Sequence, residues 1–204
     1  MTVGRIAGVV LAAGESSRMG RDKALLRYRG RTFLETILNT LRQAEVAPVV
    51  VVLGHHAEAI LREVKMGNAT VVINANYSQG QTSSLLRGLK ALEADEPEAI
   101  VLCLVDHPAV SPESIRLLSA AYGQSSPPVV VPTFEGRRGH PVLIGRALFE
   151  ELKGLSPAEG ANTVIRKHRA HGREIEVPDS GILMDIDDPE SYRQWANKDS
   201  EEGG

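Results

Sequence analysis

Short apolar runs that alternate with amphipathic helical patterns are the feature that most limits how this chain can fold. The runs, rich in β-branched residues, occupy residues 6–11, 49–53, 70–73, 100–105 and 129–131. Apolar side chains at helical spacing occupy residues 33–44, 57–64, 83–93 and 112–122. Strands that are apolar throughout have both faces covered, as in parallel sheets between two layers of helices. We therefore predict an α/β fold, a three-layer, doubly wound, Rossmann-like structure with a mostly parallel sheet.

After residue 131 the pattern is less regular, but it still predicts short strands and helices. An exposed turn is expected at 134–139 between two short strands, with further strands at 141–144, 175–177 and 181–185. Helices are expected at 146–152, at 162–168 and from Pro189 to Trp195. Ser111 and Asp188, each followed by proline, are expected to be helix N-caps. We expect residues 1–196 to form a single domain and the polar residues 197–204 to form a disordered tail.

Composition and charge argue against several classes of partner. The net charge is −3 and aromatic residues make up 4% of the 204 residues, whereas nucleic-acid and anionic-membrane binders are usually basic and single-strand binders use aromatic stacking. No apolar stretch reaches the roughly 18 residues of a membrane span. The single cysteine, Cys103, lies inside an apolar run and is expected to be buried. We expect a cytoplasmic protein with neither nucleic-acid nor membrane partners.

The loop after the first apolar run is the first place to look for a ligand, because open α/β sheets bind ligands at the carboxyl ends of their strands. It contains small residues and two glycines, Gly14 and Gly20, which let backbone amides approach an anion. Six basic residues and one acid lie between residues 18 and 31. We expect Arg18 and Lys23 to contact phosphate, and the arginines at 27, 29 and 31 to be solvated surface.

Two common phosphate motifs are absent from this loop. Gly14 and Gly20 are too far apart for the Walker pattern, and no lysine follows Gly20. The dinucleotide fingerprint Gly-x-Gly-x-x-Gly is also missing. P-loop hydrolysis and nicotinamide binding of the usual Rossmann kind are therefore disfavoured.

Residues 10–26 read VLAAGESSRMGRDKALL. This stretch resembles the signature of the nucleotidyltransferases related to the enzymes of molybdenum cofactor maturation. The resemblance extends over about residues 6–195 and implies a fold of the nucleotide-diphospho-sugar transferase type. It also implies that Arg18 and Lys23 contact a triphosphate. Ala13 stands where the guanylyl-transferring branch usually has glycine, so the chain is most similar to the cytidylyl-transferring branch.

Residues 74–85 resemble the family segment Asn-x-x-Trp-x-x-Gly-Met-x-x-Ser, which reads the base and ribose. Gly80 would allow close backbone approach, and Ser83 or Ser84 would supply a hydroxyl. The nucleotide-binding residues that the resemblance implies are Leu11, Ala12, Ala13, Gly14, Ser16, Arg18, Met19, Gly20, Lys23, Asn74, Gly80, Ser83 and Ser84.

Acidic residues stand where two predicted strands end, and Mg²⁺ is usually held by one or two carboxylates together with phosphates. Residues 106–108 resemble the Asp-x-Pro motif of the family, whose aspartate binds magnesium. Residues 185–190 resemble its late Asp-Ile-Asp-Thr-Pro-Glu motif. Asp106 and Asp185 are therefore the expected metal ligands. Asp187 would share a face with Asp185 on an extended strand and is the fallback.

Gly139-His140-Pro141 matches a Gly-His-Pro motif on the acceptor side of the cytidylyl branch. The other histidines considered, at 55, 56, 168 and 171, lack metal-ligand spacing and are expected to be surface or packing residues. A Gly-Asp-x-Gly-Ala-Arg motif of that branch is only partly kept, because Asn162 replaces its arginine. A guanidinium binds phosphate well, so this departure leaves the acceptor the least defined part of the site.

These residues predict transfer of a nucleoside monophosphate from a nucleoside triphosphate to a phosphomonoester, with release of pyrophosphate. The resemblance implies that the triphosphate is CTP and that the acceptor is a molybdopterin-type cofactor. The predicted catalytic residues are Arg18, Lys23 and Asp106, and a molybdenum enzyme would receive the product. The second dissociation of a phosphomonoester has a pKa of about 6, so the attacking group needs no general base. The alternatives are a sugar- or alcohol-phosphate acceptor, and a non-catalytic nucleotide-binding or cofactor-delivery module.

Overall fold

A computed structural model describes residues 5–17, 19–156 and 158–193 of the chain. The strands are β1 (Ile6–Ala12), β2 (Arg27–Tyr28), β3 (Arg31–Thr32), β4 (Val49–Leu53), β5 (Thr70–Ile73), β6 (Ala99–Leu104), β7 (Val129–Phe134), β8 (Arg137–Arg138), β9 (Val142–Gly145) and β10 (Arg173–Glu176). The α-helices are α1 (Phe33–Gln43), α2 (Ala57–Glu63), α3 (Gln81–Ala91), α4 (Pro112–Ser125), α5 (Phe149–Lys153) and α6 (Asn162–His168). Short 3₁₀ turns are η1 (Lys23–Leu25), η2 (Tyr77–Gln79), η3 (Glu93–Asp95), η4 (Arg146–Leu148), η5 (Arg169–His171) and η6 (Ser180–Leu183).

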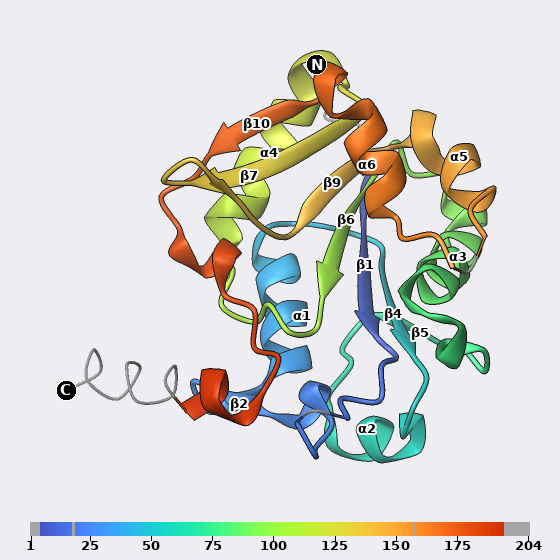
Figure 1. Ribbon diagram of the computed structural model, residues 1–204, viewed down its shortest axis with the longest axis vertical. Helices are drawn as coiled ribbons and strands as arrows, with labels where there is room; N and C mark the ends of the chain where they lie inside the picture. Colours follow the sequence, from blue (N-terminus) through green and yellow to red (C-terminus); the bar gives the residue numbers. More distant parts are fainter. Residues whose placement is uncertain (1–4, 18, 157, 194–204) are drawn as a thin grey trace.

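Eight of the strands form one sheet in the order β10-β7-β9-β6-β1-β4-β5, with β8 paired to β7. The pairs β6–β1, β1–β4, β4–β5 and β7–β10 are parallel. Figure 1 shows the arrowheads of β1, β4 and β6 pointing to the same edge, near α2 and β2. The predicted mixed α/β fold with a mostly parallel sheet is confirmed, and its carboxyl edge gathers the loops that follow β1, β4, β5 and β6.

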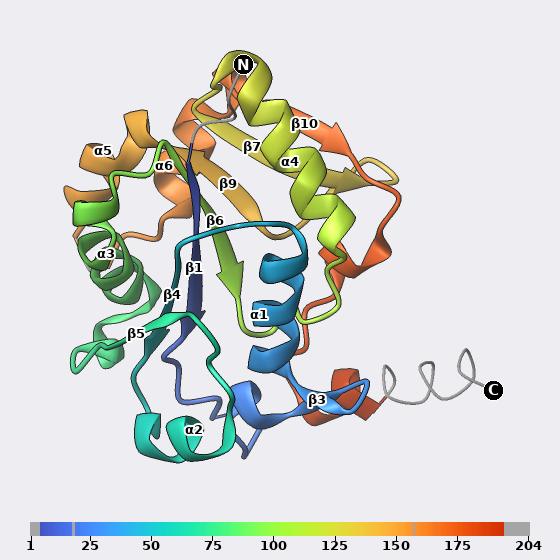
Figure 2. The same ribbon diagram turned by 180° about the vertical axis from the view of Figure 1, so that it is seen from behind.

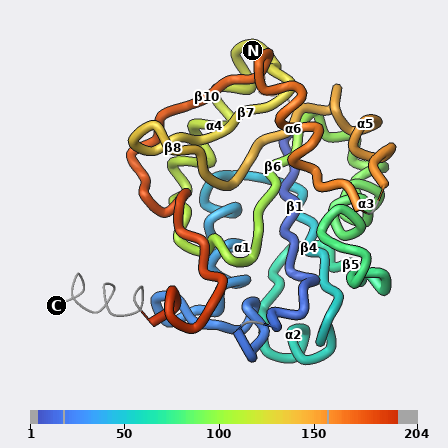
Figure 3. Tube along the Cα trace, in the orientation of Figure 1, coloured from blue at the N-terminus to red at the C-terminus, as the bar shows by residue number. Residues whose placement is uncertain are grey.

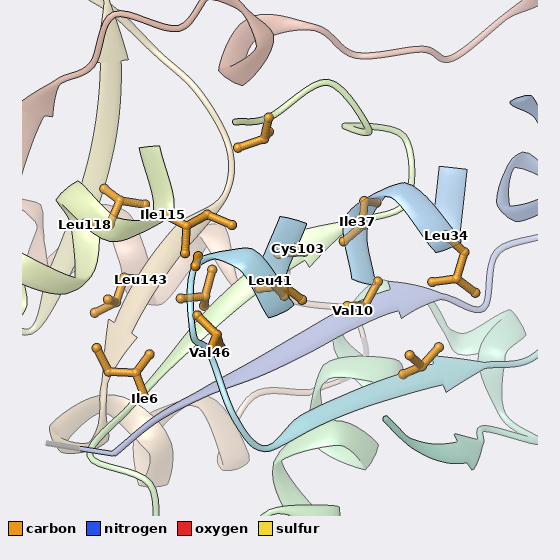
Figure 4. Packing of buried hydrophobic residues seen from close by; sticks show 14 of the residues in the cluster. Ile6, Val10, Leu34, Ile37, Leu41, Val46, Cys103, Ile115, Leu118 and Leu143 are labelled. Atoms are coloured by element: carbon orange, nitrogen blue, oxygen red, sulfur yellow. The ribbon is translucent and has the colours of Figure 1, made fainter. Parts of the chain in front are cut away.

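Both faces of the sheet are covered by helices because the central strands are apolar on both sides. In β1, Val10 and Ala12 belong to one buried cluster, whereas Val9 and Leu11 belong to the other. The first cluster includes apolar residues of α1, α2 and α4, and the second those of α3, α5 and α6. Figure 2 shows α1 and α4 on the near face of the sheet. Figure 4 shows the packing in the first cluster, where Cys103 is buried as expected.

Helix caps fix where two helices begin. At α1 the Thr32 hydroxyl accepts from the Glu35 backbone N–H at 3.1 Å, and the Glu35 carboxylate accepts from the Thr32 N–H at 3.0 Å, which is a capping box. The expected cap of α4 is confirmed, since the Ser111 hydroxyl accepts from Ser114 N–H at 3.2 Å. Asp188 likewise accepts from the N–H groups two and three residues later, at 2.9 and 2.8 Å.

One strand of the mostly parallel sheet runs the other way, because β9 is antiparallel to both β6 and β7. One sequence-based prediction about strands needs correction. Residues 181–185, predicted as a strand, instead contain the end of η6, which begins where Asp179 accepts from the Gly181 N–H at 2.9 Å. The apolar side chain of Ile182 is buried in this turn. An apolar run can therefore be buried here without any strand pairing.

The last described segment lies beside β2 and the start of α1. The Tyr192 hydroxyl donates to the Arg27 carbonyl oxygen at 3.1 Å, and the rings of Tyr192 and Phe33 lie 6.0 Å apart. Figure 3 traces this approach of the C-terminal segment to the β2 region. Residues 189–193 are helical, as predicted. Trp195, the predicted disordered tail 197–204 and Arg18 lie outside the described residues.

No helix within the described ranges is long and apolar enough to span a bilayer.

Candidate active site

A cleft of about 340 Å³ lies at the carboxyl edge of the sheet, between the loop after β1, the segment after β5 and the end of β6. The small residues Ala13 and Gly14 of the first loop line it. Tyr77 and Gly80 come from the segment after β5. The lining residues are Leu11, Ala13, Gly14, Ser16, Ser17, Lys23, Tyr77, Gly80, Gln81, Ser84, Leu104, Val105, Asp106 and Asp187.

Lys23 is the central cation of this cleft. Its ammonium group donates to Asp106 Oδ2 at 3.1 Å and to Asp187 Oδ1. The side chain is 11% exposed. Burial alone lowers the pKa of Lys23, but hydrogen bonds and charges from Asp187 and Asp106 outweigh it and raise the pKa above its ordinary value. The lysine therefore stays charged, and its backbone N–H donates to Ser16 Oγ at 3.1 Å, which ties it to the first loop.

The other oxygen of Asp106 faces a different group of side chains. Asp106 Oδ1 is buried and has no hydrogen-bond partner within the described part of the chain. His107 Nε2 lies 4.0 Å from it. Ligand atoms of Asp106, His107 and Asp185 all lie within 4.8 Å of one another. The two expected metal ligands are thus brought together, whereas Asp187, the fallback, pairs with Lys23.

His107 escaped the sequence reasoning although it is adjacent to Asp106. Its side chain is 10% exposed, and its ring centroid lies 4.7 Å from that of His140. Burial lowers the pKa of His107, and burial together with the charge of His107 lowers the pKa of His140 to about 4. Each Nδ1 atom is buried without a hydrogen-bond partner among the described residues. The His140 ring is therefore neutral at pH 7.

The Gly139-His140-Pro141 segment braces the turn that precedes Asp185. The His140 backbone N–H donates to the Ile182 carbonyl oxygen at 2.9 Å. A Cβ atom on Gly139 would lie 2.2 Å from the same oxygen, so only glycine permits this approach. His140 and Pro141 line a small apolar cavity together with His107 and Cys103. None of the expected acceptor residues, which are Gly139, His140 and Pro141, lines the larger cleft.

Asn74 organises the segment after β5 from below the surface. Its side-chain amide donates to Ser83 Oγ at 2.9 Å and to Ser84 Oγ at 3.0 Å, and its Oδ1 accepts from the Asn76 N–H at 3.0 Å. Asn74 is 5% exposed and does not line the cleft. Ser84 and Gly80 do line it. Ser83 does not, and its hydroxyl donates to nearby carbonyl oxygens.

Two histidines after β4, expected to be surface or packing residues, contact neighbouring loops of the site. His55 Nδ1 lies 3.2 Å from the hydroxyl of the cleft residue Tyr77. His56 Nδ1 lies 3.1 Å from Oδ2 of Asp22, the residue that immediately precedes Lys23 in the chain. Tyr77 stands at the tryptophan position of the Asn-x-x-Trp motif. This match in the sequence could have indicated that Tyr77 lines the cleft.

Among the predicted nucleotide-binding residues, those that line the cleft are Leu11, Ala13, Gly14, Ser16, Lys23, Gly80 and Ser84. Ala12 is buried in the core, and Met19 packs in a small apolar cluster with Phe33 and Ile186. Gly20 is exposed, with a φ of +63° that favours glycine. Arg18 cannot be placed, because it lies outside the described residues.

Comparison with known proteins adds named relatives to this geometry. The chain is 34% identical over 201 residues to nicotine blue oxidoreductase of Paenarthrobacter nicotinovorans, covering 92% of the chain and 95% of the relative. It is 38% identical over 172 residues to a probable molybdenum cofactor guanylyltransferase of Opitutus terrae, covering 84% and 76%. It is 22% identical over 185 residues to the molybdenum cofactor cytidylyltransferase of Escherichia coli, covering 90% and 92%.

Solved structures share the architecture over nearly the whole chain. Rv0371c from Mycobacterium tuberculosis H37Rv superposes with a TM-score of 0.84 at 32% identity, over 95% of this chain and 98% of that one. The same protein in complex with manganese gives a TM-score of 0.79 at 30% identity, over 93% and 97%. A family model described as the MobA-like NTP transferase domain matches residues 8–172. The chain therefore belongs to the family of proteins with a MobA-like NTP transferase domain.

Proposed function

We propose that this protein is a Mg²⁺-dependent nucleotidyltransferase that moves CMP from CTP to a phosphomonoester, most closely a molybdopterin-type cofactor. The observation that carries the proposal is the arrangement around Asp106. One of its carboxylate oxygens binds the Lys23 ammonium in the cleft, the other lies near His107 Nε2, and the Asp185 carboxylate belongs to the same group of possible metal ligands. A lysine at the end of a glycine-containing loop, facing carboxylates that come from the end of β6 and from the late acidic segment, is a charge arrangement suited to a metal-bound triphosphate.

The residues present fit a divalent cation. Asp106 Oδ1 is buried and lacks a hydrogen-bond partner in the part of the chain described, and a second carboxylate, Asp185, lies close by. Asp106 and Asp185 would hold the ion. When bound, it neutralises phosphate charge and orients the α-phosphate. The manganese complex of the M. tuberculosis relative supports a divalent cation in this family.

The chain's own residues then account for the transfer. Backbone amides near Ala13 and Gly14 approach the phosphates, and Lys23 stabilises negative charge on the leaving pyrophosphate, with Arg18 as its expected partner. The acceptor phosphate oxygen forms a bond to the α-phosphorus while the α–β bridging P–O bond breaks, and pyrophosphate leaves with those electrons. The acceptor attacks as an anion, so no proton has to be removed by a base.

Two features favour the finer assignments of nucleotide and acceptor. Ala13, which lines the cleft, is the residue that makes the first loop resemble the cytidylyl branch. The acceptor class follows from relatives named molybdenum cofactor cytidylyltransferase and guanylyltransferase. Because these names differ in the base, CTP and GTP have to be compared directly. A sugar phosphate is the alternative acceptor, favoured by the partial loss of the family motif at Asn162.

The test is a matrix of CTP, GTP, ATP and UTP against molybdopterin-type cofactor and sugar phosphates, with Mg²⁺ and release of pyrophosphate as the readout. CTP with the cofactor is expected to give the highest kcat/KM. Lys23→Met should reduce kcat/KM about 10²- to 10³-fold, as expected for losing one charge-stabilising donor. Lys90→Met, which changes an exposed lysine on α3, is the matched control and should leave activity unchanged.

Asp106→Asn is expected to abolish turnover while the far-ultraviolet circular dichroism stays that of the folded protein. Unchanged pyrophosphate release in this variant would refute the assignment of Asp106. Preference for a sugar phosphate would overturn the proposed acceptor, and tight CTP binding without turnover would identify a binding or delivery module.

The relative named nicotine blue oxidoreductase makes a redox activity the second candidate. The missing Gly-x-Gly-x-x-Gly fingerprint argues against nicotinamide binding of the usual kind in the first loop. Oxidation of NADH and NADPH by nicotine blue should be measured on the same preparation. Turnover there, with none in the nucleotide matrix, would decide for the oxidoreductase.

A further inference from the structure

The Asp106 carboxylate faces two separate groups, one on each oxygen. Oδ2 accepts from Lys23, which also contacts Asp187. Oδ1 is buried without a hydrogen-bond partner among the described residues and lies 4.0 Å from His107 Nε2, and ligand atoms of Asp106, His107 and Asp185 lie within 4.8 Å of one another. A cation bound at Oδ1 therefore need not displace Lys23, because the lysine already uses the other oxygen.

Three independent contacts hold the second group in place. The His107 backbone N–H donates to the Leu104 carbonyl oxygen at 3.1 Å, which closes the turn after β6. The His107 ring is nine-tenths buried and rests against His140. The Ile186 N–H donates to the Asp106 carbonyl oxygen at 3.0 Å, which brings the neighbouring residue Asp185 to the same turn.

The spacing of the ligand atoms suits one octahedral ion. Ligands about 2.1 Å from a common cation lie about 3 to 4.2 Å apart. His107 Nε2 and Asp106 Oδ1 are 4.0 Å apart, and with Asp185 all ligand atoms lie within 4.8 Å. Asp185 is exposed, and a bound ion would draw its carboxylate inward over the remaining distance.

An imidazole nitrogen changes which cation such a site favours. Mg²⁺ takes oxygen ligands almost exclusively, whereas imidazole suits first-row transition cations, and Mn²⁺ accepts both kinds of ligand. A set of two carboxylates and one histidine therefore differs from the all-oxygen set that the sequence predicted.

We propose that His107 is the third protein ligand of the metal, and that it makes this site favour a first-row divalent transition cation over Mg²⁺. The proposal rests on the proposed function for the presence of a metal, and it deepens that function by naming the ligand set and the class of cation. Mg²⁺ still supports activity at millimolar concentration, but a transition cation binds more tightly.

Direct coordination by nitrogen is tested with Mn²⁺ as the probe, using the full chain without nucleotide, alone and with pyrophosphate. Pyrophosphate contains no nitrogen, so any ¹⁴N hyperfine coupling in pulsed EPR comes from the protein. Wild-type protein should show an imidazole ¹⁴N coupling, and His107→Asn should lose it. His171→Asn, at an exposed histidine far along the chain, is the matched control and should keep it.

Affinity provides a second measurement, and its wild-type part does not depend on the fold of the His107 variant. Competition of Mg²⁺ against bound Mn²⁺ should show wild-type protein preferring Mn²⁺ by at least about tenfold, with this ratio falling towards one in His107→Asn. Asp185→Asn should weaken both ions while keeping the ¹⁴N coupling of the fraction that is bound.

Absence of ¹⁴N coupling in wild-type protein, or no Mn²⁺ binding at millimolar concentration, overturns the proposal. Nucleotidyl transfer by a wild-type protein that shows no ¹⁴N coupling would overturn the assignment of His107 as a ligand and leave the proposed function standing. Coupling that depends on His107, together with no transfer to any acceptor, would instead support the metal site and refute the proposed function.

Discussion

Gly139→Ala tests whether the Gly139-His140-Pro141 segment is the brace for the late acidic segment. In the folded protein the new Cβ would lie 2.2 Å from the Ile182 carbonyl oxygen and 2.8 Å from Ile182 Cγ1. The two backbone segments must separate by about 1 Å to reach ordinary contact. Such overpacking costs about 1–3 kcal/mol. The separation also weakens the hydrogen bond from His140 N–H to the same oxygen, which contributes about 1 kcal/mol.

The expected loss is about 3 kcal/mol, which for a chain of this size lowers Tm by about 6–12 °C. Thermal unfolding and urea titration at pH 7 measure it. Gly160→Ala is the control, because its Cβ would meet nothing closer than a backbone nitrogen at 4.0 Å and its φ is not positive; its Tm should stay within about 2 °C of wild type. A Gly139→Ala protein as stable as this control would refute the close approach on which the brace depends.

Two further predictions concern buried titratable groups. Burial and the charge of His107 lower the pKa of His140 from 6.5 to about 4. Between these two values the unfolded chain binds a proton at His140 that the folded protein does not bind. The contribution of the neutral His140 to stability is therefore full above pH 6.5 and is lost as pH falls toward 4. The free energy of unfolding should fall by about 2 kcal/mol between pH 7 and pH 5 beyond the change in His140→Gln, and equal slopes in urea titrations of the two proteins would contradict this. Burial also raises the pKa of Cys103 to about 12, so Ellman's reagent at pH 8 should find no reactive thiol in the native protein and one in urea. Rapid labelling of the native protein would show that the core around Cys103 opens.

The sequence was sufficient to predict the parts of this molecule where local pattern and burial agree. The apolar runs at 49–53 and 70–73 are strands with the predicted bounds. A short apolar, β-branched run between two helices is buried most readily as a strand of the sheet that those helices cover. The first loop was singled out by its glycines and charges, and Lys23 lies in the cleft. The direction of β9 was not predictable, because its apolar residues are the same whether its neighbours run parallel or antiparallel.

The sequence was insufficient where a side chain's role depends on a distant partner. Nothing local to Lys23 indicates that it contacts Asp187, 164 residues away. His107 follows Asp106 directly, yet its place beside Asp185 depends on the turn at Leu104 and on η6. The strand predicted at 181–185 failed for the same reason. Gly181 approaches the Ala109 carbonyl oxygen so closely that a Cβ atom on it would lie 2.3 Å from that oxygen, and this contact is set by tertiary packing.

The alternation expected of the late acidic segment nevertheless persists without a strand. Ile186 is buried, and its N–H binds the Asp106 carbonyl oxygen, so the acids on either side of it are both directed toward Asp106. They make different contacts there. Asp187 contacts Lys23, whereas Asp185 lies in the group with His107. The sequence suggested that Asp187 could take the place of Asp185 as a ligand, but the two acids make different contacts and are not substitutes for each other. In our proposal each serves a different cation, and moving a carboxylate from 185 to 187 cannot restore the metal site.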